Sequence, residues 1–155
     1  MIAKPHYEVT KLDVARDAPF AKDWQDELGG GIAEQLKEFA ELEDERKQLT
    51  WAIRVGDQTV GIVWLRLEDT QDIQAPSMYI LIGNTAHRTK GIGSAVIKDT
   101  IRYAYCNLPY EKLYSRYLTS NSTAEGLLRK LGFERDGDAY DDEEGNAWQN
   151  VKITL

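Results

Sequence analysis

The chain has 155 residues, of which 42% are hydrophobic and 29% are charged, a composition typical of one globular domain with its own core. The net charge of −7, from 26 acidic and 19 basic residues, excludes the basic footprint that nucleic-acid binding requires. It suits a cationic substrate such as an amine, or serves solubility alone.

The sequence lacks the residues and segments that disulfides, metal sites and membrane spans require. A single cysteine, Cys106, rules out an internal disulfide and a cysteine-cluster metal site, and two isolated histidines do not make a zinc site. We expect Cys106 to be a buried structural thiol. No apolar run approaches the roughly 20 residues of a membrane span, and Met1–Tyr7 lacks the layout of a signal peptide. The sequence predicts one cytoplasmic domain over residues 1–155, without a metal or a membrane partner.

The N-terminal half predicts one strand, two helices and then three strands. Four apolar residues recur at helical spacing in the second helix, and Gly29–Gly31 must separate the two helices because consecutive glycines are costly in a helix interior. The predicted elements are the strand Tyr7–Leu12, the helices Ala18–Leu28 and Ile32–Leu42, and the strands Leu49–Val55, Thr59–Leu67 and Met78–Ile82. Because Thr59–Leu67 is apolar on both faces, we expect it to be central.

The C-terminal half predicts two helices that alternate with strands. The apolar face of the first helix runs to Tyr105. Ser122 and Glu125 form a capping-box pair before the second helix, and Gly132 stands where a left-handed residue ends it. The predicted elements are the helices Gly91–Tyr105 and Ser122–Leu131 and the strands Lys112–Leu118, Phe133–Tyr140 and Trp148–Leu155. Helices between the later strands imply a mixed sheet that is covered on both faces.

The strongest local signal lies where the strand Met78–Ile82 leads into the next helix. Arg88-x-x-Gly91-x-Gly93 opens that helix. The first amides of a helix have no partner within it, and the helix dipole favours negative charge there. Glycines let the backbone approach a pyrophosphate closely, and Arg88 and Lys90 add positive charge. The pattern indicates an anion cradle, although glycines also serve a plain strand-to-helix turn.

Two other phosphate-binding motifs do not fit this segment. A Walker loop beginning at Gly83 would need a second glycine where Arg88 stands. The Rossmann fingerprint needs a third glycine three residues after Gly93, where Val96 stands.

Two motifs together resemble the GNAT superfamily of N-acetyltransferases. Arg88-x-x-Gly91-x-Gly93 on a strand-to-helix turn resembles the pyrophosphate-binding motif, and Asn121-x-x-Ala124 followed by Leu127–Phe133 resembles the second motif of the family. Both stand in the family's order and spacing. The resemblance implies a mixed, mostly antiparallel central sheet of about six to seven strands, with helices on both faces and a V-shaped splay between the fourth and fifth strands.

The resemblance also implies acetyl-CoA as the co-substrate, without a metal. Backbone groups of the fourth strand would bind the pantetheine arm and the amides beyond it the pyrophosphate. Asn121 would contact the pantetheine or the thioester, or is a plain turn residue ahead of a helix. Gly126 costs about 1 kcal/mol inside its helix, which suggests close approach of the coenzyme or of a neighbouring element. The coenzyme-binding residues expected are Leu81, Ile82, Arg88, Thr89, Lys90, Gly91, Ile92, Gly93, Ser94 and Asn121.

The general acid of the family is not in its usual place. Many relatives carry a tyrosine that protonates the departing thiolate, and the matching position here is Leu128. In the branch that acetylates ribosomal proteins a serine stands where this chain has Ala124. Tyr79 and Tyr117 are catalytic candidates by proximity, with their acid or base role unassigned. Acidic residues of the early helices and of the loop Asp141–Asn146 are candidates for a base acting through water, or form a solvated surface.

The resemblance implies direct attack of an amine on the thioester, without a covalent enzyme intermediate. We expect acetylation of a primary amine on a small cationic molecule. The alternatives are acetylation of a protein N-terminus, as by ribosomal-protein acetyltransferases, and a CoA-binding sensor without catalysis. By analogy with relatives we expect a homodimer, in which Trp148–Leu155 would be the pairing edge.

Overall fold

The computed structural model describes residues 6–88 and 91–155. By its internal contacts the chain divides into two compact units. The first runs to Leu65 and includes Ile80–Ile97, and the second consists of Arg66–Tyr79 and Lys98–Leu155. Each unit is described by itself, and the single domain expected over residues 1–155 stays a prediction.

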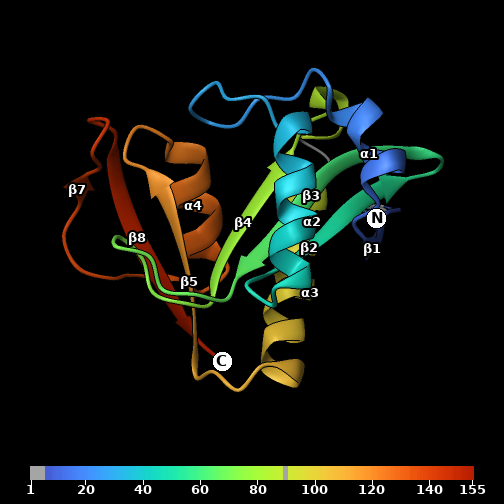
Figure 1. Cartoon of the computed structure of the whole chain (residues 1–155). Helices are drawn as coiled ribbons and strands as arrows, with labels where there is room; N and C mark the ends of the chain where they lie inside the picture. Colours follow the sequence, from blue (N-terminus) through green and yellow to red (C-terminus); the bar gives the residue numbers. More distant parts are fainter. Residues whose placement is uncertain (1–5, 89–90) are drawn as a thin grey trace, which may run out of the picture. The chain divides into compact units, whose positions relative to one another are not determined.

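The described residues form four α-helices, two short 3-10 helices and eight strands (Figure 1). In chain order the elements are β1 (Glu8–Lys11), α1 (Val14–Ala21), η1 (Ala33–Gln35), α2 (Leu36–Asp44), β2 (Gln48–Val55), β3 (Gln58–Arg66), β4 (Ser77–Ile82), η2 (Thr85–His87), α3 (Ile92–Asn107), β5 (Lys112–Leu118), α4 (Ser122–Lys130), β6 (Glu134–Arg135), β7 (Tyr140–Asp141) and β8 (Ala147–Thr154).

The strand order β1-β2-β3-β4-β5-β8-β6, with β7 paired to β8, confirms the predicted mixed sheet. The pairs β1–β2, β5–β8, β6–β8 and β7–β8 are antiparallel. At the expected splay, the fourth and fifth strands β4 and β5 form a parallel pair that is joined at Ser77 and Tyr114, and Ser77 is the first residue of β4. The sheet has eight strands rather than six to seven because the predicted strand Phe133–Tyr140 is divided into β6 and β7.

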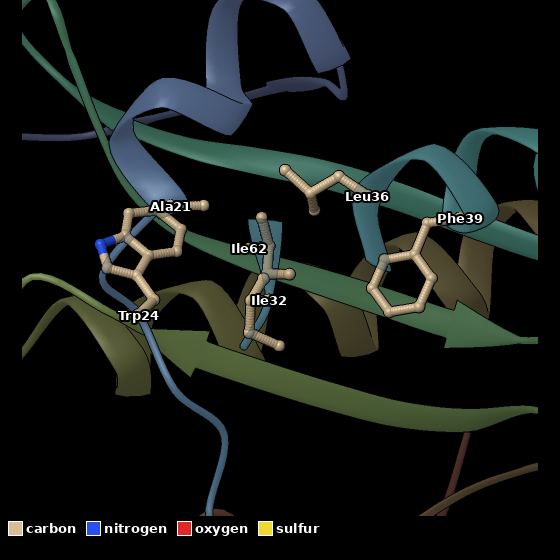
Figure 2. Packing of buried hydrophobic residues seen from close by; sticks show 6 residues of the cluster. All are labelled: Ala21, Trp24, Ile32, Leu36, Phe39 and Ile62. Atoms are coloured by element: carbon tan, nitrogen blue, oxygen red, sulfur yellow. The ribbon is translucent and has the colours of Figure 1, made fainter. Parts of the chain in front are cut away.

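In the first unit, side chains from the α1–α2 region pack on β3. Six buried residues form the centre of this cluster (Figure 2), and the ring of Phe39 lies 4.9 Å from that of Trp64. The six are Ala21, Trp24, Ile32, Leu36, Phe39 and Ile62. The prediction that β3 is central is confirmed, because Ile62 on one face and Val63 on the other are both 0% exposed.

A buried carboxylate ties α1 to the β2–β3 hairpin. Asp17 accepts hydrogen bonds from Arg16 Nε at 2.7 Å, from Thr59 Oγ1 at 2.6 Å and from the amide of Asp13 at 2.9 Å, and Arg54 lies 3.7 Å away. Burial alone would raise the pKa of Asp17, but the hydrogen bonds from Arg16, Thr59 and Asp13 outweigh it and lower the pKa below its ordinary value. The charged carboxylate thus fixes the helix on the hairpin.

Both N-terminal helices differ from the predicted ranges. α1 begins at Val14 because Asp13 caps it, accepting from the amide of Arg16 at 3.2 Å, and it ends at Ala21. The rest of the predicted helix is a closed loop, in which the Asp26 carboxylate accepts from the amides of Leu28 and Gly30 at 2.9 and 2.8 Å. The second predicted helix is confirmed as α2, but its first turn forms the separate 3-10 helix η1.

In the second unit, α4 begins at Ser122 as predicted and ends at Lys130, one residue before the predicted end, with the glycine stop in its expected place. Gly132 has φ +105°, and the amide of Phe133 donates to Leu128 O at 3.0 Å, which completes a Schellman motif. The capping-box prediction is wrong, because the N-cap is Asn121 rather than Ser122. Glu125 instead pairs with Arg135 at 3.1 Å.

The end of α3 also differs from the prediction. Tyr105 is 69% exposed and Cys106 is an exposed free thiol. Ala104 is fully buried, and since each helical residue is turned by about 100° from the one before, the next two side chains point away from the core. The expected buried thiol is therefore wrong.

Candidate functional site

The start of α3 has the geometry of an anion cradle. Gly91 has φ +78°, a left-handed conformation that strains residues with a side chain. Ile92 is 2% exposed and anchors the first turn. The amide of Ala95 donates to Gly91 O at 3.1 Å, so the amides of Ile92, Gly93 and Ser94 precede the first bond of the helix. The first turn contains no acidic residue.

Gly93 and Gly126 each have open space at the position where a side chain would begin. A Cβ added to Gly93 would meet no atom within 4 Å, and the same holds for Gly126 inside α4. The close approach of a neighbouring element, one of the two explanations expected for Gly126, is therefore not observed. Open space at Gly93, beside the first amides of a helix, fits a diphosphate such as that of coenzyme A.

Arg88 is anchored at the end of β4. Its Nε donates to the carbonyl oxygen of Ile82 at 2.8 Å, although the side chain is exposed. This bond ties the Arg88 guanidinium to the end of β4, where its positive charge favours an anion. Thr89 and Lys90, also predicted to bind the coenzyme, lie outside the described residues.

The two predicted residues of β4 differ in the direction of their backbone groups. The carbonyl oxygen of Leu81 lies against Gly61 of β3, where an added Cβ would collide with it. The carbonyl of Ile82 accepts from Arg88 instead. Because successive residues of a strand turn their peptide groups to opposite edges, Ile80 shares the direction of Ile82. The sequence prediction omitted Ile80, which only the strand register identifies.

A tryptophan covers the end of β4. The indole of Trp24, 6% exposed, lies so close to Gly83 that a Cβ there would overlap the ring. The amide of Gly83 donates to Val60 O at 2.9 Å, which holds this end of β4 against β3. No local sequence signal pointed to this contact, because Trp24 and Gly83 are far apart in the chain.

Asn121 acts as the N-cap of α4. Its Oδ1 accepts from the amide of Ala124 at 3.0 Å, which is the turn role that the sequence left open. The side-chain oxygen accepts this one bond from the helix, and the Nδ2 group is the donor that the side chain offers to a coenzyme. Leu128, at the position of the family's tyrosine, is 6% exposed and packs in the core of the second unit.

The two candidate tyrosines have different surroundings. The half-buried Tyr79 accepts a hydrogen bond from Ser77 Oγ at 3.2 Å. Tyr117 is 4% exposed and lines a pocket with Glu125 and Arg135. Hydrogen bonds to Glu125 and then to Tyr117 raise the pKa of Arg135 above its ordinary value. Both tyrosines and Asn121 belong to the second unit, whereas Leu81–Ser94 belongs to the first.

Asp142, in the acidic loop Asp141–Asn146, has a structural role. Asp142 accepts from Trp148 Nε1 at 2.9 Å and from the amide of Asn146 at 2.8 Å. These bonds, that from Trp148 first, lower the pKa of Asp142 from 3.8 to about 2. The centre of the Trp148 ring also lies 3.9 Å from the guanidinium carbon of Arg116. A carboxylate with so low a pKa is a poor proton acceptor near neutral pH, so Asp142 is not a suitable general base.

Within the described ranges 6–88 and 91–155, no cluster of three or more histidine, cysteine or acidic residues has the arrangement of a metal site. No helix of those same ranges has the length and apolar character needed to cross a membrane.

Sequence comparison identifies the family. The acetyltransferase (GNAT) domain family matches residues 10–134, a span that includes parts of both units. The chain belongs to the GNAT acetyltransferase family. This GNAT chain is 25% identical over 104 residues to the uncharacterized N-acetyltransferase YoaA of Bacillus subtilis (strain 168). The match covers 66% of this chain and 58% of YoaA, less than two thirds of the relative's length.

Solved structures show the same GNAT fold at low sequence identity. A chimera of spermidine N-acetyltransferase SpeG from Vibrio cholerae and hSSAT has a TM-score of 0.76 and 17% identity, with 95% of each chain covered. The ribosomal-protein-S5-alanine acetyltransferase of Vibrio fischeri has a TM-score of 0.72 and 15% identity, covering 98% of this chain and 94% of that one. These likenesses support the fold and leave the substrate open.

Proposed function

We propose that the chain transfers the acetyl group of acetyl-CoA directly to a primary amine. The observation that carries the proposal is the start of α3, where a left-handed Gly91 and an unobstructed Gly93 stand among amides that precede the Ala95-to-Gly91 hydrogen bond, without an acidic residue in the first turn. Membership of the GNAT family supports acyl transfer. Within the family this arrangement suits the diphosphate of the coenzyme.

Each proposed binding residue has a specific task. The amides of Ile92, Gly93 and Ser94, with Gly91 setting the turn, donate to the diphosphate, as does the predicted amide of Thr89. Arg88 and the predicted Lys90 add positive charge. Backbone groups of Leu81 and Ile82 bind the pantetheine arm, to which we add Ile80. Asn121 donates through Nδ2. The coenzyme, when bound, supplies the acetyl thioester that the amine attacks.

The proton for the departing thiolate is assigned to a tyrosine. In the hydrogen bond with Ser77 the phenol of Tyr79 is the acceptor, and its half-buried position suits proton donation to a bound molecule. Tyr117 is the second candidate, although its side chain is buried in the pocket beside Arg135.

We propose a small cationic amine as the acceptor. The net charge of −7 favours cations, and one structural neighbour is a spermidine N-acetyltransferase. A protein N-terminus is the second candidate, because another neighbour acetylates ribosomal protein S5. We further propose that residues 1–155 form one cytoplasmic acyltransferase domain that acts as a homodimer.

Thiol release from acetyl-CoA tests the proposal when it is scanned across spermidine, an aminoglycoside, amino acids and N-terminal peptides. Turnover with spermidine or the aminoglycoside is the expected result, with mass spectrometry showing one added acetyl group. Turnover with peptides alone would favour the second candidate. Acetyl-CoA binding without turnover on any amine would contradict catalysis and favour a sensor.

A further inference from the structure

The strands β4 and β5 are joined at the closed end of the splay by their backbones and by one side chain. The amide of Tyr114 donates to Pro76 O at 2.9 Å, beside the register pair of Ser77 and Tyr114. Further along β4, the carbonyl oxygen of Met78 accepts from the hydroxyl of Ser115 at 2.8 Å. Met78 is 1% exposed and Ser115 is 5% exposed, and all of these residues belong to the second unit.

The hydroxyl of Ser115 stands where a backbone donor would continue the parallel pair. Hydrogen bonds between parallel strands are evenly spaced, so the register of Ser77 with Tyr114 would next bring the amide of Arg116 to Met78 O. Among the described residues, however, the register of β4 and β5 contains that one pair. The side chain of Ser115 therefore extends the contact between the two strands beyond their backbone pairing.

Met78 lies in line with the groups of β4 that we assign to the coenzyme. Because successive residues turn their peptide groups to opposite edges of a strand, Met78, Ile80 and Ile82 direct theirs to the same edge. With the diphosphate at the start of α3, the pantetheine arm runs back along β4 from Ile82 to Ile80. The acyl group, at the far end of that arm, then points toward Met78 and its hydrogen bond with Ser115.

We propose that Ser115 restricts the acyl group to a short chain, so that acetyl-CoA is preferred to butyryl-CoA. This inference rests on the proposed function. The bond from Ser115 to Met78 O holds β5 against β4 at the inner end of the splay, where both side chains are buried. A longer acyl chain has to displace them. Because Ser115 acts through the spacing of the strands, it is a positioning residue.

Calorimetric titration with acetyl-CoA, propionyl-CoA and butyryl-CoA, without an acceptor amine, tests the proposal. A site that excludes one methylene group discriminates by about tenfold or more, so the parent chain should bind acetyl-CoA at least about tenfold more tightly than butyryl-CoA. Ser115→Ala loses the hydrogen bond, and this preference should shrink on the order of fivefold. Ser115→Thr keeps a hydroxyl group and should keep the preference.

Thr50→Ala is the matched control, because it removes a buried hydroxyl from β2, which neighbours neither β4 nor β5 in the sheet. It should keep the parent's preference. The proposal is overturned by equal binding of acetyl-CoA and butyryl-CoA to the parent, by an unchanged preference in Ser115→Ala, or by the same change in Thr50→Ala.

The titrations also separate this proposal from the proposed function. Selective binding of acetyl-CoA without turnover on any amine would support the role of Ser115 and contradict acetyl transfer. Turnover without a preference among the three thioesters would overturn the role of Ser115 alone. Failure of all three thioesters to bind would overturn the coenzyme site and this inference together.

Discussion

The indole ring of Trp24 lies against the backbone of Gly83, the residue that follows β4. The same tryptophan accepts at its carbonyl from the amide of Ile32 at 3.2 Å, so it links the loop after α1 to the start of η1 as well. One buried side chain therefore fixes the strand end that leads to the proposed coenzyme site.

Gly83→Ala should lower the free energy of unfolding by about 1–3 kcal/mol, because the added methyl overlaps the Trp24 ring. Urea denaturation measures this. Gly31→Ala is the matched control, since a Cβ there meets no atom within 4 Å. In the double variant with Trp24→Leu, the cost of the alanine should shrink. Equal stability of Gly83→Ala and the parent chain would show that the ring does not press on this backbone.

The variant Asn121→Ser separates the helix-capping role of Asn121 from its proposed contact with the coenzyme. Serine caps a helix about as well as asparagine, so stability should stay within about 0.5 kcal/mol, whereas Asn121→Ala should cost about 1 kcal/mol. Serine lacks the amide donor, and acetyl-CoA affinity should fall by up to about tenfold. Calorimetric titration of both variants measures the affinity. A serine variant that binds the coenzyme like the parent would leave Asn121 with the capping role alone.

Gly126→Ala should stabilise α4 by about 0.5–1 kcal/mol, because the added methyl meets no atom of the chain and alanine is the better helix former. If the coenzyme passes close to this turn, its affinity should fall at the same time. Thermal unfolding and acetyl-CoA titration on one preparation report both effects. A stabilised variant with unchanged affinity would exclude the coenzyme as the reason for the glycine.

The sequence predicted correctly those helices and strands that depend on the local pattern of residues. The alternation in β2 and β8 and the glycine stop after α4 gave the correct elements. The position of α1 on the hairpin depends on a distant contact, since Asp17 is held by Thr59 of β3. The segment 133–140 is divided because Gly137, at φ +75°, interrupts it, and alternation of apolar residues does not reveal this break.

In the candidate site, too, local features could be predicted from the sequence, whereas features that depend on distant contacts could not. Spacing alone located Gly91 and Gly93, because a glycine-rich helix start is a local feature. The direction of the peptide groups of Leu81 and Ile82 depends on how β4 lies against β3, which requires the strand register. The wrong capping box has a simpler cause: both Asn121 and Ser122 are good N-caps, and the backbone at Asn121 decides between them.

The low pKa of Asp142 predicts a specific pH dependence of the stability of the fold. Its pKa is about 2 in the folded chain against an ordinary 3.8, so its stabilising effect is fully present above the ordinary value and is lost as pH falls through about 2. The stability difference between the parent and Asp142→Asn should therefore shrink as the pH is lowered over this range. Urea midpoints at several pH values measure it, with the exposed Asp138→Asn as control. Identical pH profiles for the parent and Asp142→Asn would contradict the assignment.

Titration of the Gly93→Glu variant with acetyl-CoA tests the central claim most directly. Gly93 has room for a side chain, and a glutamate in the first turn suits the helix dipole, so the variant should fold normally by circular dichroism. Its carboxylate would occupy and repel the place of the diphosphate. We predict that the parent chain binds acetyl-CoA, that Gly93→Ala retains part of this affinity, and that Gly93→Glu shows none. Normal affinity in a folded Gly93→Glu variant would contradict the placement of the coenzyme at the start of α3.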